Sequence, residues 1–157
     1  MADNIEKGIE ELLRKGKSKT EIWEMFGQGR EPHKALFYLN NSSLPRDRKK
    51  FQLINLLLAL GLLVITTKKL ITALSFGTLD IFLLFSLVVP VINIYVLREI
   101  LRFHRIGYQF LFVLSCLALL QPENHHELEL FILVLLIGLS GYLHQQMFPV
   151  KNKIRIQ

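Results

Sequence analysis

The side chains best suited to chemistry lie in a short polar stretch late in the chain. His125 and His126 stand there together, with carboxylates at Glu123, Glu127 and Glu129. Imidazole and carboxylate groups are ligands for divalent transition metals. Adjacent histidines on a helix point about 100° apart and rarely bind one ion together, whereas His126 and Glu129, three residues apart, share a face. The candidate metal ligands are therefore His125, His126 and Glu129.

The same stretch is also typical of the start of a helix. Asn124 can cap the helix, and an acidic first turn is favoured by the helix dipole. Histidines beside carboxylates can in addition titrate near neutral pH and serve as a pH sensor. We favour the capping interpretation, and we expect no bound metal and no other cofactor.

Catalytic patterns are missing from the rest of the sequence. It contains no P-loop, no GxGxxG, no HExxH and no recognisable Ser/His/Asp arrangement. The single cysteine, Cys116, lies inside an apolar run, where it can form no intramolecular disulfide and has no evident base beside it. We therefore expect that the protein is not an enzyme.

Four apolar runs dominate the chain beyond residue 50. Hydrophobic residues make up 51% of the sequence, and they gather into runs at about 51–67, 81–97, 106–121 and 128–148. A helix that crosses a bilayer needs about 17–25 mostly apolar residues. Each run is interpreted as one span. The third run is short, so its helix must extend into the flanking residues or lie where the bilayer is thinned. Residues 70–79 are compatible with a loop, an interfacial segment or a helix.

Basic residues flank these runs unevenly. With a cytoplasmic N-terminus, ten basic residues lie on the cytoplasmic side, namely Arg46, Arg48, Lys49, Lys50, Arg98, Arg102, Arg105, Lys151, Lys153 and Arg155. Only Lys68 and Lys69 lie on the other side. Cytoplasmic loops carry an excess of Lys and Arg, so the sequence predicts four spans with both termini in the cytoplasm. The short loops and the lack of an apolar signal segment indicate the inner, cytoplasmic membrane of a bacterium.

Residues 1–44 are rich in charge and form a separate N-terminal module. Ser18 and Glu21 have the spacing of a capping box ahead of an apolar stretch. Gly16 stands where a helix would end, and Pro32 where another would begin. Two or three short helices of this kind resemble a helix-turn-helix in outline. The balanced charge of the module argues against nucleic acid as a partner, because a DNA-binding face is usually basic.

Small and polar residues recur inside the predicted spans. Asn55 and Asn93 lie in the first and second spans, and Gly138, Gly141 and His144 form a stripe in the fourth. Such residues either pack helices together or line a pore or substrate path. We favour packing, because no Asp, Glu, Lys or Arg lies at the centre of any predicted span.

Three arginines follow the second span at helical spacing. Arg98, Arg102 and Arg105 fall on one face of a helix that continues past the span. At that depth they can contact anionic lipid headgroups, and each contact contributes on the order of 1 kcal/mol to membrane binding.

These patterns predict an all-α protein with two parts. Residues 1–44 form a small helical cytoplasmic module, and residues 45–157 form a polytopic membrane domain, a bundle of four transmembrane helices. We expect a non-catalytic interaction or scaffold subunit, surrounded by lipid bilayer and self-associating as a homo-oligomer or within a larger membrane complex. The alternatives are a small oligomeric ion channel or pore-former, and a membrane-tethered nucleic-acid-binding regulator.

Overall fold

The computed structural model describes residues 2–29, 31–75, 81–121 and 127–154, and within these ranges the chain is helical, without strands. The all-α prediction is confirmed for the described residues. The helices in chain order are α1 (Ala2–Arg14), α2 (Lys19–Phe26), α3 (Pro32–Asn41), α4 (Pro45–Ser75), α5 (Ile81–Leu101), α6 (Arg105–Leu119) and α7 (Glu127–Met147), followed by a 3-10 turn at Val150–Asn152.

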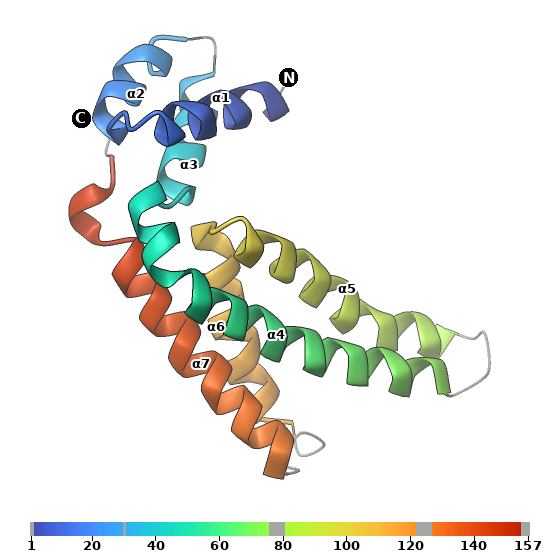
Figure 1. Ribbon diagram of the computed structural model, residues 1–157. Helices are drawn as coiled ribbons and strands as arrows, with labels where there is room; N and C mark the ends of the chain where they lie inside the picture. The colour runs from blue at the N-terminus through green and yellow to red at the C-terminus, as the bar shows by residue number, and fades with distance from the viewer. Residues whose placement is uncertain (1, 30, 76–80, 122–126, 155–157) are drawn as a thin grey trace.

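The four longer helices form two hairpins. Helix α4 packs along α5 and α6 along α7, and α5 also contacts α6 while α4 contacts α7. Figure 1 shows the two hairpins meeting at the end that carries α1–α3, which we call the module end. The core between them is apolar, and its largest fully buried side chains are Leu58, Leu62, Ile100, Tyr108, Leu111, Leu136, Leu143 and Met147.

The outward faces of these helices are apolar as well. Leu53 is 78% exposed, and Leu84 and Phe131 are 67% exposed. Among the described residues, three helices are long and apolar enough to cross a membrane, in α4, α5 and α7, whereas α6 has 15 residues and is shorter. A water-facing surface of this kind would be costly, and the three apolar helices are compatible with a multi-pass membrane protein.

The segment after the first predicted span is helical. Helix α4 runs without interruption from Pro45 to Ser75, so that residues 70–75 extend the first span instead of forming a loop. Residues 76–80 lie outside the described residues. Near the far end of α4, Lys68 pairs with Glu129 of α7 at 2.6 Å and ties the two hairpins together.

The N-terminal module has a small core of its own. Ile9, Leu13, Ile22, Ala35 and Leu39 are buried against one another. The predicted capping box is confirmed, because the Ser18 hydroxyl accepts from the Glu21 N–H and the Glu21 carboxylate accepts from the Ser18 N–H, both at 3.3 Å. Gly16, with φ +85°, ends α1 as predicted.

The chain after α7 returns to this module. Ile154 packs against the module core. The Asn40 side chain donates to the Ile154 carbonyl and accepts from the Ile154 N–H, each at 3.0 Å. The module therefore includes a piece of the C-terminal segment as well as α1–α3.

A sharp turn separates α5 from α6. The Phe103 N–H donates to the Ile100 carbonyl and the His104 N–H to the Glu99 carbonyl, each at 2.9 Å. This is the bonding pattern of a Schellman motif, with Phe103 in the left-handed conformation at φ +57°. The expected continuous helix through Arg98, Arg102 and Arg105 is wrong, because the motif ends α5 at Leu101 and α6 begins at Arg105.

Gly107 allows the first turn of α6 to lie directly on the last turn of α5. A Cβ atom at Gly107 would be 2.8 Å from the Ile100 nitrogen and 2.9 Å from the Glu99 carbonyl carbon. Backbone atoms cannot move aside as a flexible side chain can. The close contact therefore requires a residue without a side chain.

Replacing Gly107 should show this constraint. Gly107→Ala is expected to lower the free energy of unfolding in detergent by about 1–3 kcal/mol, because the new methyl group overlaps the α5 backbone. The matched control is Gly138→Ala in α7, where an added Cβ meets nothing within 4 Å. Equal stability of the two variants would contradict the close packing of α5 on α6.

Candidate functional site

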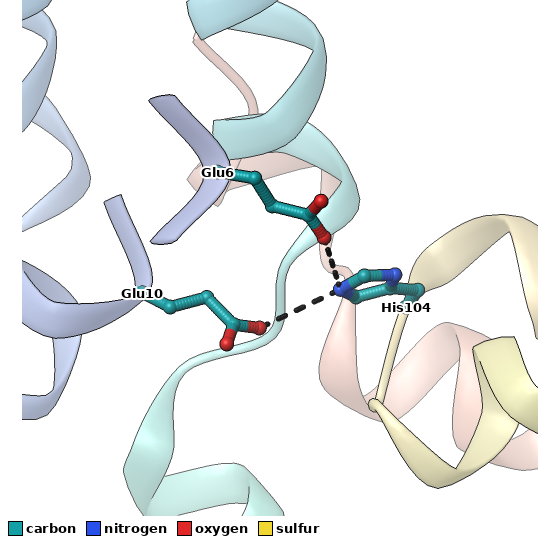
Figure 2. A group of neighbouring side chains, drawn as sticks. All are labelled: Glu6, Glu10 and His104. Carbon is teal, nitrogen blue, oxygen red and sulfur yellow. Dashed lines mark ion pairs between the residues drawn. The ribbon is translucent and has the colours of Figure 1, made fainter. Parts of the chain in front are cut away.

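A cluster of charged side chains joins the module to the helical bundle. We call it the charged junction, and it consists of Glu6, Glu10, Arg48, Glu99, Arg102 and His104. Its members come from α1, from the start of α4, from the last turn of α5 and from the α5–α6 turn. Figure 2 shows Glu6 and Glu10 of α1 pointing from one side toward the ring of His104.

Helical spacing aims the two glutamates at the bundle. Glu6 and Glu10 lie four residues apart and therefore share one face of α1. Ile9 and Leu13 occupy the neighbouring face and bury it in the module core. The seating of α1 on α3 thus determines where both carboxylates point.

The His104 ring is almost completely buried, with 2% of its surface exposed. Its Nδ1 lies 2.7 Å from Oε2 of Glu99, which the Schellman turn brings alongside. Its Nε2 lies 3.6 Å from Oε1 of Glu6 and 3.6 Å from Oε1 of Glu10. At those distances Nε2 has no hydrogen-bond partner, although it is buried.

Two arginines balance the carboxylates. Arg102 donates to Glu6 Oε1 at 2.5 Å, and the Arg48 guanidinium lies 3.6 Å from Glu10 Oε1. The His104 side chain, and then the Arg48 charge, hold the pKa of Glu10 below its usual value against the opposing effect of burial. Glu10 is therefore a carboxylate at neutral pH, available for an ion pair or as a ligand.

Glu6, Glu10 and His104 form a group with the composition of a metal site. Each offers one nitrogen or oxygen atom, and these three atoms all lie within 4.8 Å of one another. No other such group of His, Cys, Asp and Glu occurs within the described ranges.

Hydrogen bonds that involve the backbone also connect the module to the bundle next to the charged junction. The Asn41 side chain accepts from the Ile106 N–H at 2.9 Å, and Ser42 forms an isolated bridge with His104. Lys19 donates to the Ser42 carbonyl at 2.6 Å. The short segment between α3 and α4 is thus bonded both to the module and to the α5–α6 turn.

A basic groove opens beside the junction. Its volume is about 740 Å³, and it lies between the α1–α2 turn, the start of α4 and the C-terminal segment. Its basic lining residues are Arg14, Lys17, Lys19, Arg46, Lys151 and Lys153, and no acidic residue lines it within the described part of the chain. Trp23, Leu44 and Ile154 add apolar surface.

Burial in this basic environment changes the acidity of Lys19. Burial, and then the charges of Arg48 and Arg105, lower the pKa of its ammonium group to about 8. The lowered pKa reflects mainly the loss of water around the ammonium group, and the neighbouring arginines add to it.

The polar residues predicted inside the spans have separate surroundings. Asn55, 2% exposed, donates to the Ile100 carbonyl at 3.0 Å and accepts from the Tyr108 hydroxyl at 2.6 Å. Asn93, 7% exposed, lines a mostly apolar cavity of about 200 Å³ between all four long helices. Both lie inside the bundle.

The predicted stripe on α7 does not form one surface. Gly138 faces open space, whereas Gly141 lies near the Phe112 ring, which an added Cβ would meet at 3.5 Å. His144 is half-buried, and its Nε2 accepts from Arg105 at 3.3 Å. These residues thus have three different environments.

The residues predicted to contact lipid headgroups or to bind a metal do not form one site either. Arg98 is exposed, while Arg102 and Arg105 are engaged with Glu6 and His144. His125 and His126 lie outside the described residues. Glu129 is buried and paired with Lys68.

The charged junction was not predicted. Glu6 and Glu10 had the spacing of a shared helical face, and His104 stood in a polar break between two apolar runs. Neither signal indicates the other, because the two parts are about a hundred residues apart in the chain and only the folded structure brings them together.

Comparison of the chain with protein-family models, with curated proteins and with solved structures finds no match.

The buried charge of Lys19 predicts a dependence of stability on pH. The pKa is about 8 in the folded protein and about 10.4 in an unfolded chain, so the unfolded state binds more protons between these values. The cost of burying the charge is complete below about pH 8 and disappears as the pH rises toward about 10. The wild-type protein should gain stability over this range relative to Lys19→Met.

The measurement is the difference in unfolding free energy between the two proteins at several pH values in one detergent. Lys17→Met, which removes an exposed lysine of the same groove, is the matched control for other groups that titrate in this range. A difference between wild type and Lys19→Met that stays constant from about pH 7 to 10 would contradict the lowered pKa.

Proposed function

We propose that this chain is a non-catalytic interaction or scaffold subunit of a bacterial cytoplasmic membrane, with four spans and both termini in the cytoplasm. Asn40 before α4 and Ile154 after α7 are hydrogen-bonded to each other. An even number of crossings accounts for this contact, and α6 together with its flanking residues supplies the fourth.

The distribution of charge supports the orientation. Lys68 and Lys69 lie near the far end of α4, whereas the basic residues of the module end are Arg46, Arg48, Lys49, Lys50, Arg98, Arg102, Arg105, Lys151 and Lys153. Because positive residues are retained in the cytoplasm, the module end is proposed to face it.

The basic groove is the observation that carries the interaction role. It is built jointly by the module, the first span and the C-terminal segment, so a partner bound there contacts all three. Six basic side chains without an acidic neighbour in the described lining are complementary to a negatively charged partner. The partner is proposed to be an acidic segment of another protein, whose apolar side chains can contact Trp23 and Leu44.

The burial of the span asparagines supports packing over conduction. In a pore between copies, the lining side chains must face the surface of each copy. Asn55 and Asn93 face the interior, and both polar groups of Asn55 are used in hydrogen bonds. The apolar outer faces remain available for lipid and for self-association.

Binding of an acidic peptide tests the proposed role. The full-length protein in neutral detergent should bind a labelled glutamate-rich peptide, with an affinity that falls as salt is added. The double variant Lys151→Glu/Lys153→Glu, in the groove, should weaken binding on the order of 10-fold or more. Lys49→Glu/Lys50→Glu is the matched control, because both lysines are exposed at the same end but do not line the groove.

Two results would contradict the proposal. One is the absence of binding by the wild-type protein, and the other is an equal loss in both double variants, which would indicate attraction by net charge alone. Tighter binding of a duplex oligonucleotide than of the peptide would favour the nucleic-acid-binding alternative.

The variant Asn55→Leu distinguishes a helix-packing role of Asn55 from a pore-lining role. If Asn55 packs helices, the variant should lose about 1–3 kcal/mol of stability, because the Tyr108 hydroxyl is left buried without its acceptor. Tyr108→Phe in the same background should recover part of this loss. Liposomes with the wild-type protein should show no ion flux. An ion flux that is abolished by Asn55→Leu would contradict the scaffold proposal.

A further inference from the structure

We propose that Glu6, Glu10 and His104 form a binding site for one divalent first-row transition metal ion, which fastens α1 to the α5–α6 turn. This inference does not depend on the proposed function. It rests on the unpartnered nitrogen of a buried histidine, directed at two carboxylates that come from a different part of the chain.

The spacing of the ligand atoms fits an ion between them. Two atoms held about 2.1 Å from one ion at the tetrahedral angle lie about 3.4 Å apart. The distances from His104 Nε2 to the Glu6 and Glu10 oxygens are both 3.6 Å. These distances are too long for hydrogen bonds, but a small movement of each carboxylate brings them to coordination geometry.

Glu99 supplies the support that a metal-binding histidine requires. Histidine ligands usually donate their other ring N–H to a carboxylate or a carbonyl, which orients the ring and selects the tautomer. The Nδ1 of His104 lies 2.7 Å from Glu99 Oε2. With its proton on Nδ1, the ring presents the lone pair of Nε2 to the two carboxylates. Figure 2 shows this nitrogen facing Glu6 and Glu10.

Arg102 can move away from Glu6 and make room for the ion. The carboxylates of Glu6, Glu10 and Glu99 carry three negative charges against two positive charges on Arg48 and Arg102, so the junction has a formal charge of −1 with a neutral His104. The Arg102 side chain is 31% exposed and can turn toward solvent. It thereby releases the Glu6 oxygen that an ion would take.

The donor set selects the class of ion. One imidazole nitrogen with two carboxylate oxygens suits Zn²⁺, Mn²⁺ or Fe²⁺, whereas Mg²⁺ and Ca²⁺ prefer oxygen ligands alone. Three protein ligands leave at least one position open for water. Because two ligands belong to the module and one to the bundle, the bound ion crosslinks the two parts of the protein.

Zn²⁺ binding by the full-length protein in neutral detergent tests the site. We expect one tightly bound ion per chain in the wild type. Glu99→Gln should weaken binding by about 10- to 100-fold, and His104→Gln should weaken it further. His33→Gln is the matched control, because His33 is an exposed histidine of the module. Bound Zn²⁺ should also slow the proteolysis of α1–α3 in the wild type but not in His104→Gln.

A rival location is tested in the same series. The pair His125→Gln/His126→Gln should bind Zn²⁺ as tightly as the wild type. Loss of binding in that pair, retention of tight binding in His104→Gln, or no binding by the wild type would each overturn the proposal. If His104→Gln does not fold, X-ray absorption of the wild-type Zn²⁺ complex decides, because one imidazole with oxygen ligands is expected and two imidazoles would refute the site.

Discussion

The reversal of the chain between α5 and α6 is the constraint on which the other contacts depend. The Schellman bonds at Phe103 and His104, and the close approach allowed by Gly107, hold the end of one helix against the start of the next. A left-handed phenylalanine costs about 1–2 kcal/mol, and surrounding contacts have to offset that cost. The result is that His104 is buried beside Glu99 and directed at α1.

Among the described residues, the larger groups of charged side chains lie at the module end of the bundle, while the Lys68–Glu129 pair lies near the far end. The outward faces of the long helices are apolar, and the hydrogen bonds of Asn55 are satisfied within the core. The charged junction and the basic groove both lie where the module meets the bundle. Within the junction Glu6, Glu99 and His104 are buried, whereas Arg102 is partly exposed and most basic residues of the groove are exposed. The exposed basic side chains can exchange partners at less cost than the buried groups, because water solvates their charge.

Local sequence patterns predicted much of the fold and little of the candidate site. The capping box at Ser18, the end of α1 at Gly16 and the apolar helices were predictable, because each depends on residues within a few turns of one another. The continuous arginine helix was wrong, because a Schellman turn without glycine at its left-handed position has no clear sequence signal. The junction itself depends on pairing residues from opposite parts of the chain.

The sequence by itself determined that the chain is helical, that long apolar helices follow a charged N-terminal module and that basic residues gather near particular helix ends. These properties follow from composition and periodicity, which act over short distances along the chain. Only the tertiary structure decided that Glu6 and Glu10 face His104, that Asn55 and Asn93 are buried, and that lysines from both ends of the chain line one groove. The physical reason is that side-chain proximity between distant segments depends on how helices pack, and packing is a property of the whole fold.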